Sequence, residues 1–232
     1  MLIQNNLIRS AHENDIEKFI FLGSSCIYPK FAPQPIKEEY LLTGSLEPTN
    51  EWYAIAKISG VKLIEALRKQ YIRDYVSLMP TNLYGPNDNF DLKTSHVLPA
   101  MIRKFHEAKE NNHAKVTLWG SGSPMREFLH VDDLGQAVLF ALEHKLEEHL
   151  YNVGSGSDLT IKALAEIIQK VVGHKGEVIW DDTKPDGTPK KLMDSSKLNA
   201  KGWSSTINLE KGIKTTHEWF LDHNESFKEI KF

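Results

Sequence analysis

The chain has 232 residues, of which 41% are hydrophobic and 25% charged, and its formal net charge at pH 7 is −3. This composition is typical of a soluble globular protein, and the lack of a basic excess argues against nucleic acid and acidic membranes as partners. No apolar run is long enough to span a bilayer, and no signal peptide opens the chain. A single cysteine, Cys26, excludes an internal disulfide. We therefore expect a cytoplasmic protein with a free thiol, and we assign no metal site.

Hydrophobic periodicity along the chain alternates between the strand and the helix pattern. Strands are expected at 19–22, 75–79, 116–119, 128–131, 150–153 and 177–180. Helices are expected at 2–14, 51–71, 95–109, from a cap at Asp132 or Asp133 to about 143, at 161–172 and at 209–221. The order strand, loop, helix, strand is the pattern of a parallel βαβ unit. The sequence therefore predicts an α/β fold with a smaller, mixed C-terminal lobe.

The first strand, Phe19 to Leu22, stops abruptly at Gly23 and is followed by two serines and the cysteine. If the chain stays extended past Gly23, side chains alternate in direction. Ser24 and Cys26 would then face one way and Ser25 the other. We therefore expect one face of this tip to carry a hydroxyl and a thiol together.

Tyr53 and Lys57 lie four residues apart on the longest predicted helix, and so on one face of it. A nearby cation favours phenolate, which would make Tyr53 a better proton donor and acceptor near neutral pH. The ordinary alternative is a surface tyrosine above a solvated lysine. A second strand tip, containing Asn82, follows this helix, and ligands of open α/β sheets bind at such carboxyl ends. This grouping favours a functional site.

Several further motifs are spread along the chain: Gly23-Ser-Ser-Cys-Ile-Tyr-Pro29, Glu47-Pro-Thr-Asn-Glu-Trp-Tyr-Ala-Ile-Ala-Lys57, Met79-Pro-Thr-Asn-Leu-Tyr-Gly-Pro86, Ser95-His-Val-Leu-Pro99, Trp119-Gly-Ser-Gly, Met125-Arg-Glu-Phe-Leu-His-Val-Asp-Asp133 and Lys184-Pro-Asp-Gly-Thr-Pro189. They resemble the motifs of the GDP-L-fucose synthases, the GDP-4-keto-6-deoxy-D-mannose 3,5-epimerase-4-reductases of the extended short-chain dehydrogenase/reductase superfamily. The resemblance covers essentially the whole chain. Dehydratase relatives usually show Thr-Asp-Glu at the tip, so Cys26 favours epimerase-reductase chemistry.

The resemblance implies two reactions in one pocket. For 3,5-epimerisation, Cys26 is implied as the base and His96 as the acid. For hydride transfer from NADPH to C4, Tyr53 is implied as the proton donor, Ser24 as a hydrogen-bond donor to the carbonyl, and Lys57 as the group that tunes Tyr53 and holds the nicotinamide ribose. The ordinary alternatives are a small buried thiol for Cys26 and a solvent-facing residue for His96.

The resemblance also implies binding residues for NADPH and for a GDP-sugar. The cofactor residues are Leu22, Gly23, Ser24, Ser25, Lys57, Pro80, Thr81, Asn82, Leu83 and His96. The substrate residues are Lys104, Trp119 and Arg126, with Asp186 and Lys191 as weaker candidates. Arg126 is suited to bidentate contact with phosphate. At any one of these positions the alternative is a solvated side chain.

The glycine-rich strand-turn-helix that opens members of this family does not occur in the sequence. We therefore expect the chain to be the C-terminal part of a Rossmann-like parallel sheet with helices on both faces, plus a mixed substrate-binding lobe. Residues 1–92 would form a partial NADP-binding and catalytic domain. Residues 93–232 would be mainly the GDP-sugar lobe, with about 127–153 returning to the sheet.

This departure leaves more than one function open. We expect the chain alone to bind NADPH poorly and to have little activity. It is then either an epimerase-reductase completed by a complementing N-terminal fragment or a non-catalytic module that binds nucleotide-sugars or other proteins. A related nucleotide-sugar epimerase or dehydratase is a further alternative, disfavoured by Cys26. The resemblance implies a homodimer, formed through the helix that carries Tyr53.

Overall fold

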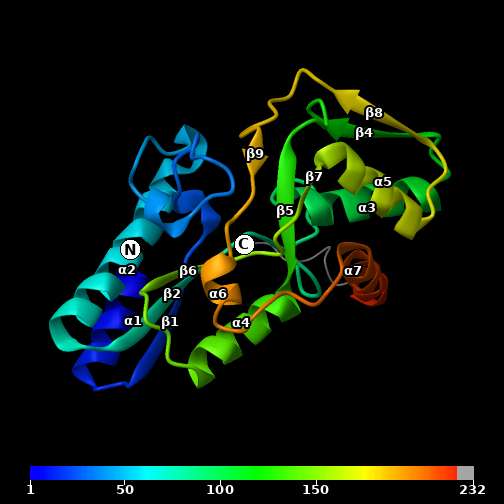
Figure 1. The fold of residues 1–232 in the computed structure, drawn as a ribbon. Coiled ribbons are helices and arrows are strands. Elements are labelled where there is room, and N and C mark those ends of the chain that lie inside the picture. The colour runs from blue at the N-terminus through cyan, green and yellow to red at the C-terminus, as the bar shows by residue number, and fades with distance from the viewer. Residues whose placement is uncertain (224–232) are drawn as a thin grey trace.

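The computed structural model describes residues 1–223 and is built around a parallel sheet with helices on both faces (Figure 1). Its strands, in the spatial order β1-β2-β6, are β1 (Lys18–Leu22), β2 (Asp74–Pro80) and β6 (Leu150–Val153). Four helices flank this sheet: α1 (Leu2–Glu13), α2 (Glu51–Tyr71), α4 (Val131–Glu143) and α6 (Ser196–Asn199). All pairings in the sheet are parallel, as the βαβ pattern predicts.

Strand β2 shows why helices cover both faces of this sheet. Tyr75 and Met79, two of its alternate residues, pack among the apolar side chains of α1 and α2. Val76 and Leu78 point to the other face and pack against α4 and α6. All four side chains are fully buried. A central strand that is apolar on both faces is the expected sequence of a parallel strand between two helix layers.

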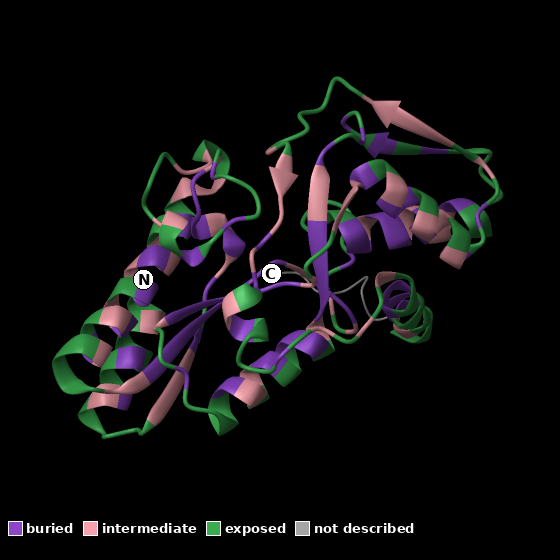
Figure 2. Ribbon diagram, in the orientation of Figure 1, coloured by how far each residue is buried: buried purple, intermediate pink, exposed green. Residues whose placement is uncertain are grey.

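A second group of strands surrounds β5 (Met125–His130). This strand pairs in parallel with β3 (Asn82–Tyr84) and β9 (Lys190–Lys191) and antiparallel with β7 (Asp158–Thr160). A separate parallel pair is formed by β4 (Lys115–Trp119) and β8 (Glu177–Asp181). Figure 2 shows buried residues along β2, β5 and β6 and exposed residues on the outer turns of the helices.

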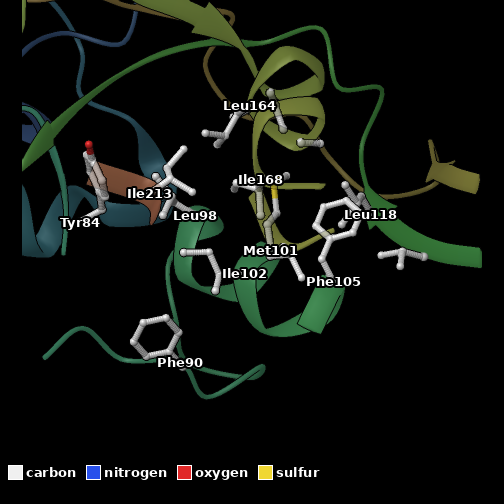
Figure 3. Packing of buried hydrophobic residues seen from close by; sticks show 14 of the residues in the cluster. Tyr84, Phe90, Leu98, Met101, Ile102, Phe105, Leu118, Leu164, Ile168 and Ile213 are labelled. Atoms are coloured by element: carbon white, nitrogen blue, oxygen red, sulfur yellow. The ribbon is translucent and has the colours of Figure 1, made fainter. Parts of the chain in front are cut away.

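The largest apolar cluster lies among α3 (Val97–Glu110), α5 (Ile161–Val172) and α7 (Leu209–His223), beneath β4 and β5 (Figure 3). Met101 and Phe105 from α3 meet Leu164 and Ile168 from α5 there. Three short 3₁₀ helices, at Ser25–Ile27, Glu38–Tyr40 and Pro48–Asn50, occur in the loops between β1 and α2. Within residues 1–223 no helix is both long and apolar enough to cross a membrane.

Most predicted elements are confirmed to within three residues, and the differences have local causes. The fourth predicted strand runs from Met125 to His130, because Val131 already begins α4. The helix expected from Ser95 begins at Val97. The predicted cap at Asp132 or Asp133 is wrong, because the imidazole of His130 accepts the hydrogen bond from the Asp132 amide at 3.2 Å.

Helix α4 and strand β6, within residues 131–153, return to the first sheet. Helix α4 contacts β1 and β2, and β6 pairs with β2, whereas β5 pairs with β3 outside that sheet. Helix α6, far along the chain, also contacts β6. The proposed division at residue 92 stays a prediction.

Candidate functional site

A cavity of about 780 Å³ lies at the carboxyl ends of β1 and β2. Its lining contains most of the site residues that the sequence predicts: Gly23, Ser24, Ser25, Cys26, Tyr53, Pro80, Thr81, Asn82, Leu83 and His96. Leu22 and Lys57 are outside the lining, although Nζ of Lys57 donates a 2.8 Å hydrogen bond to the Leu22 carbonyl beside it. The fold thus brings together side chains from two strand tips, α2 and the start of α3.

Gly23 ends β1 because no side chain fits at that position. An added Cβ would lie 2.1 Å from Cε and 2.3 Å from Sδ of Met79 on the neighbouring strand. The Gly23 amide still donates to the Leu78 carbonyl at 2.9 Å, so the pairing of β1 and β2 continues to this point. The close approach of the two strand ends fixes where the tip leaves the sheet.

The chain does not stay extended beyond Ser24, so the predicted alternation of side chains at the tip is wrong. Ser24 is extended, but its Oγ accepts a hydrogen bond from the Cys26 amide at 3.2 Å and caps a 3₁₀ turn over Ser25–Ile27. A serine hydroxyl commonly competes for backbone donors in this way. Ser25 becomes buried, while Ser24 and Cys26 stay partly accessible and line the cavity. The hydroxyl and the thiol are brought together by a turn.

The thiol of Cys26 has a cation beside it. Nζ of Lys191, from β9, donates to Sγ of Cys26 at 3.4 Å. Both residues also line a small cavity of about 50 Å³ next to the larger one. Lys191, which the sequence predicts as a substrate-binding residue, therefore lies next to Cys26, the residue implied as the base.

Tyr53 and Lys57 share a face of α2, but the lysine does not act on the phenol as expected. Burial raises the pKa of Tyr53, a repulsive charge on Cys26 raises it further, and a hydrogen bond with the Ser24 side chain opposes both. Nζ of Lys57 instead bonds the Leu22 carbonyl and lies 5.8 Å from the centroid of the Tyr53 ring. The expected lowering of the Tyr53 pKa is wrong for this arrangement. The phenol remains protonated near neutral pH.

His96 immediately precedes α3 and lines the same cavity. Its ring makes no capping bond to the helix. Asp88, a residue that the sequence reasoning missed, lines the cavity as well. Burial raises the pKa of Asp88, and the charge of His96 opposes that shift. Its Oδ2 is buried without a hydrogen-bond partner in the described part of the chain.

The other substrate candidates lie outside this cavity, around the ends of β4 and β5. Nζ of Lys104 donates to the Thr117 carbonyl at 3.1 Å and lies 5.5 Å from the ring of Trp119, which is 66% exposed. Asp186 accepts hydrogen bonds from the amide and hydroxyl of Ser121, both at 2.8 Å. Its charge also acts on Arg126. These side chains form a second polar region, separate from the cavity.

Residues 1–154 match the NAD dependent epimerase/dehydratase family. The chain belongs to this family. Within it, the chain is 60% identical over 221 residues to putative GDP-L-fucose synthase 2 of Arabidopsis thaliana, covering 95% of this chain and 67% of that protein. It is 54% identical over 237 residues to GDP-L-fucose synthase of Escherichia coli (strain K12), covering 98% of this chain and 74% of that protein.

A solved structure extends the family likeness to the fold. A GDP-L-fucose synthetase from Naegleria fowleri, bound to NADP, superposes on 96% of this chain with a TM-score of 0.88 at 29% identity, and the match covers 72% of that chain. The described α/β architecture is therefore that of the epimerase/dehydratase family. This chain spans about two thirds to three quarters of the length of these relatives.

Two buried acceptor atoms without a partner in the described part of the chain belong to residues that line the cavity of this epimerase/dehydratase. Oδ1 of Asn50 and Oδ2 of Asp88 are both buried, and neither has a hydrogen-bond partner among residues 1–223. Sequence reasoning missed both as site residues. The only signal was their position, Asn50 just before the predicted helix and Asp88 in the polar loop after the second strand tip. Ribose hydroxyls and amide groups are donors that such atoms accept.

Proposed function

We propose that this cavity converts GDP-4-keto-6-deoxy-D-mannose to GDP-L-fucose, by 3,5-epimerisation and then NADPH-dependent reduction at C4. One observation carries the proposal: Ser24, Cys26, Tyr53 and His96, which lie far apart in the sequence, line a single cavity. The likeness to GDP-L-fucose synthases over 94–98% of this chain supports the choice of substrate.

The first reaction needs a base and an acid at carbons next to a ketone. The C4 carbonyl acidifies the protons on C3 and C5, and inversion requires removal of a proton from one side and delivery to the other. Cys26 follows the tip of β1, whereas His96 precedes α3, so the two groups approach the cavity from different elements. We assign the thiolate of Cys26 as the base and His96 as the acid.

The second reaction requires a proton donor at O4. NADPH, when bound, supplies the hydride to C4. The raised pKa of Tyr53 keeps its phenol protonated, and the phenol can donate to the alkoxide as it forms. Ser24 would bond the same oxygen, and Lys57, at the rim, would hold the nicotinamide ribose. The unpartnered acceptor on Asn50 fits a cofactor amide or hydroxyl.

We assign the remaining candidates to binding. Leu22 to Ser25 and Pro80 to Leu83 would line the nicotinamide half of NADPH. The GDP moiety would lie over the second polar region, where the exposed ring of Trp119 offers a stacking surface for the base. Lys104 and Arg126 carry the positive charge that a diphosphate needs.

The test separates the two reactions. The protein is incubated with GDP-4-keto-6-deoxy-D-mannose in D₂O, first without and then with NADPH. We expect deuterium at C3 and C5 without the cofactor, and NADPH oxidation when it is added. Cys26→Ser should abolish exchange, whereas Tyr53→Phe should keep exchange and lose reduction. Deuterium exchange that persists in the Cys26→Ser variant would disprove the assignment of Cys26 as the base. If the unsubstituted protein binds GDP but neither catalyses exchange nor binds NADPH, it is a non-catalytic module.

We also propose that the protein is a homodimer through α2. Trp52 is 80% exposed and Ile55 39% exposed on the outer side of this helix, and apolar side chains of this size usually contact a partner when grouped. Trp52→Glu should shift the mass measured by light scattering from dimer to monomer. Phe31→Glu, at an equally exposed site on a loop, is the control. A dimer that survives Trp52→Glu excludes this interface.

The unpaired edge of β1 offers a place for a second polypeptide to add a strand. Within the described sheet β1 is an edge strand, and Leu2 and Ile3 on the adjacent α1 are 78% and 79% exposed. An unpaired edge with apolar neighbours readily accepts another strand. We propose that a complementing polypeptide pairs here. Co-expression with such a polypeptide should protect the amides of Lys18 to Leu22 from hydrogen exchange.

A further inference from the structure

We propose that Lys191 is the positioning residue for the Cys26 base: its ammonium holds the sulfur in the thiolate form and fixes where Sγ lies. This inference rests on the proposed function, in which Cys26 removes the C3 and C5 protons. It concerns the 3.4 Å hydrogen bond from Nζ of Lys191 to Sγ of Cys26, which joins the tip of β1 to strand β9. The two residues are 165 positions apart in the chain.

The backbone around Lys191 is held from both sides. Lys191 lies opposite Arg126 in the parallel pairing of β9 with β5. On the other side, the amide of the next residue, Leu192, donates to Oε1 of Gln34 at 2.8 Å, and its carbonyl accepts from the Ile36 amide at 2.7 Å. The strand therefore connects β5 to the loop that follows the tip. A lysine on such a fixed strand has a restricted range for its ammonium.

The neighbouring cations of Cys26 are already engaged by carboxylates, whereas Lys191 is not. Lys30 pairs with Glu47 at 3.0 Å, and Lys190 pairs with Asp158 at 3.2 Å. Among residues 1–223, no carboxylate lies within 4.0 Å of Nζ of Lys191. The other titratable groups that line the two cavities beside Cys26 are Tyr28 in the smaller one and Tyr53, Tyr84, Asp88 and His96 in the larger one. Lys191 is thus the cation available to the sulfur.

The pairing has a chemical consequence. Only the thiolate removes a proton or acts as a nucleophile, and a cation within hydrogen-bond distance favours that form. The base sits on the first sheet, but its charge partner comes from the strand group around β5. Epimerisation would therefore depend on the correct placement of β9. Reduction, which uses Tyr53 and Ser24, would depend on it less.

Alkylation by iodoacetamide tests this directly, because Cys26 is the only cysteine. The full chain, without any sugar nucleotide, is alkylated over a series of pH values and followed by intact mass. We expect Lys191→Met to slow alkylation about tenfold at pH 7. The rates of the variant and of the unsubstituted protein should converge as the pH rises, because the thiolate is the form that is alkylated. Lys191→Arg should restore most of the rate, and Lys190→Met should leave it unchanged.

Two outcomes would overturn the inference: equal rates for Lys191→Met and the unsubstituted protein at every pH, or a reduction of the same size at every pH, which would indicate altered access. If Lys191→Met does not fold, as judged by circular dichroism, Lys191→Gln takes its place. In the D₂O assay, Lys191→Met should lower the rate of deuterium exchange at C3 and C5 at saturating substrate. The KM for the sugar nucleotide should change by a smaller factor than this rate. Alkylation uses no substrate, so it tests the role of Lys191 independently of the proposed reaction. If the proposed reaction is wrong, deuterium exchange will be absent, but the alkylation rate will still depend on Lys191.

Discussion

The phenol of Tyr28 donates a 2.6 Å hydrogen bond to Oδ1 of Asn152 inside the protein, and this bond joins the turn after β1 to strand β6. Nδ2 of Asn152 donates in turn to the carbonyls of Ile36, at 2.9 Å, and Asp194, at 3.2 Å. One buried amide thus holds the tip loop and the segment after β9 against the sheet. These are the two segments that bring Cys26 and Lys191 together.

Replacing Asn152 with leucine should destabilise the protein strongly. The change leaves the Tyr28 hydroxyl and the Asp194 carbonyl without a partner, whereas the Ile36 carbonyl keeps the bond from the Asp194 amide. Each buried group left without a partner costs about 1–3 kcal/mol. We expect a loss of about 3–5 kcal/mol in the free energy of unfolding, measured by urea denaturation. Tyr28→Phe removes only one bond and should cost about 1 kcal/mol. An Asn152→Leu variant as stable as the original chain would show that this network contributes nothing.

Gly23→Ala should distort the tip of β1. The new methyl would lie 2.1 Å from Cε of Met79, whose side chain is fully buried, so Met79 must move. Overpacking of this kind costs about 1–3 kcal/mol, and thermal unfolding will measure it. Gly135→Ala is the matched control, since a Cβ at that helical position meets nothing within 4 Å. Alanine there should be stabilising by about 0.5–1 kcal/mol. Similar results for both variants would refute the clash.

The sequence predicts the elements of the fold well where periodicity is strong. Helix α2 begins and ends at the predicted residues, 51 and 71, although no side chain caps it at Asn50. Periodicity could not predict the turn after β1, because its path depends on one hydrogen bond that the Cys26 amide donates to the Ser24 hydroxyl. Propensity does not distinguish that turn from a continued strand. The candidate site residues were named because their motifs resemble those of the family, and their roles stay predictions.

Electrostatic relations were harder to predict than positions. The spacing of Tyr53 and Lys57 correctly places them on one face of α2. Burial, however, raises the pKa of Tyr53 and lowers that of Lys57, and Nζ of Lys57 donates to the Leu22 carbonyl. Lys191 was predicted to bind substrate, and only the pairing of β9 with β5 shows that it reaches Cys26. Contacts between residues 165 positions apart leave no local pattern in a single sequence.

His217 should make the stability fall in mild acid. Burial, together with the charges of His106 and Lys109, lowers the pKa of His217 to about 4 from its ordinary 6.5. The unfolded chain therefore binds a proton below pH 6.5 that the folded chain does not bind until about pH 4. Stability is lost as the pH falls through this range, by up to about 3 kcal/mol.

Urea denaturation between these pH values measures the effect of His217. His217→Leu should flatten the dependence on pH, because leucine cannot take up the proton. His144→Gln, at the exposed residue that ends α4, is the control. The same slope in the His217→Leu variant and in the original chain would rule out this source of acid sensitivity.

Asp133 and Asp132 offer a matched pair of adjacent carboxylates whose substitutions should have effects of very different size. Asp133 is buried and accepts three 3.0 Å hydrogen bonds, from the amide and hydroxyl of Thr206 and the amide of Ile207. Asp132 is 72% exposed. In Asp133→Asn the new amide would turn an N–H toward these donors, leaving at least one without a partner. We expect a loss of about 2–3 kcal/mol in the free energy of unfolding.

Asp132→Asn should change that free energy by less than about 0.5 kcal/mol, as exposed substitutions usually do. Hydrogen exchange gives a local measurement, since the amides of Thr206 and Ile207 should lose protection in Asp133→Asn alone. If the two variants were equally stable, the hydrogen bonds to Asp133 would contribute nothing to the free energy of unfolding. A selective loss of protection would instead confirm that the carboxylate at the start of α4 fixes the segment leading into α7, against which Tyr84 at the wall of the cavity is packed.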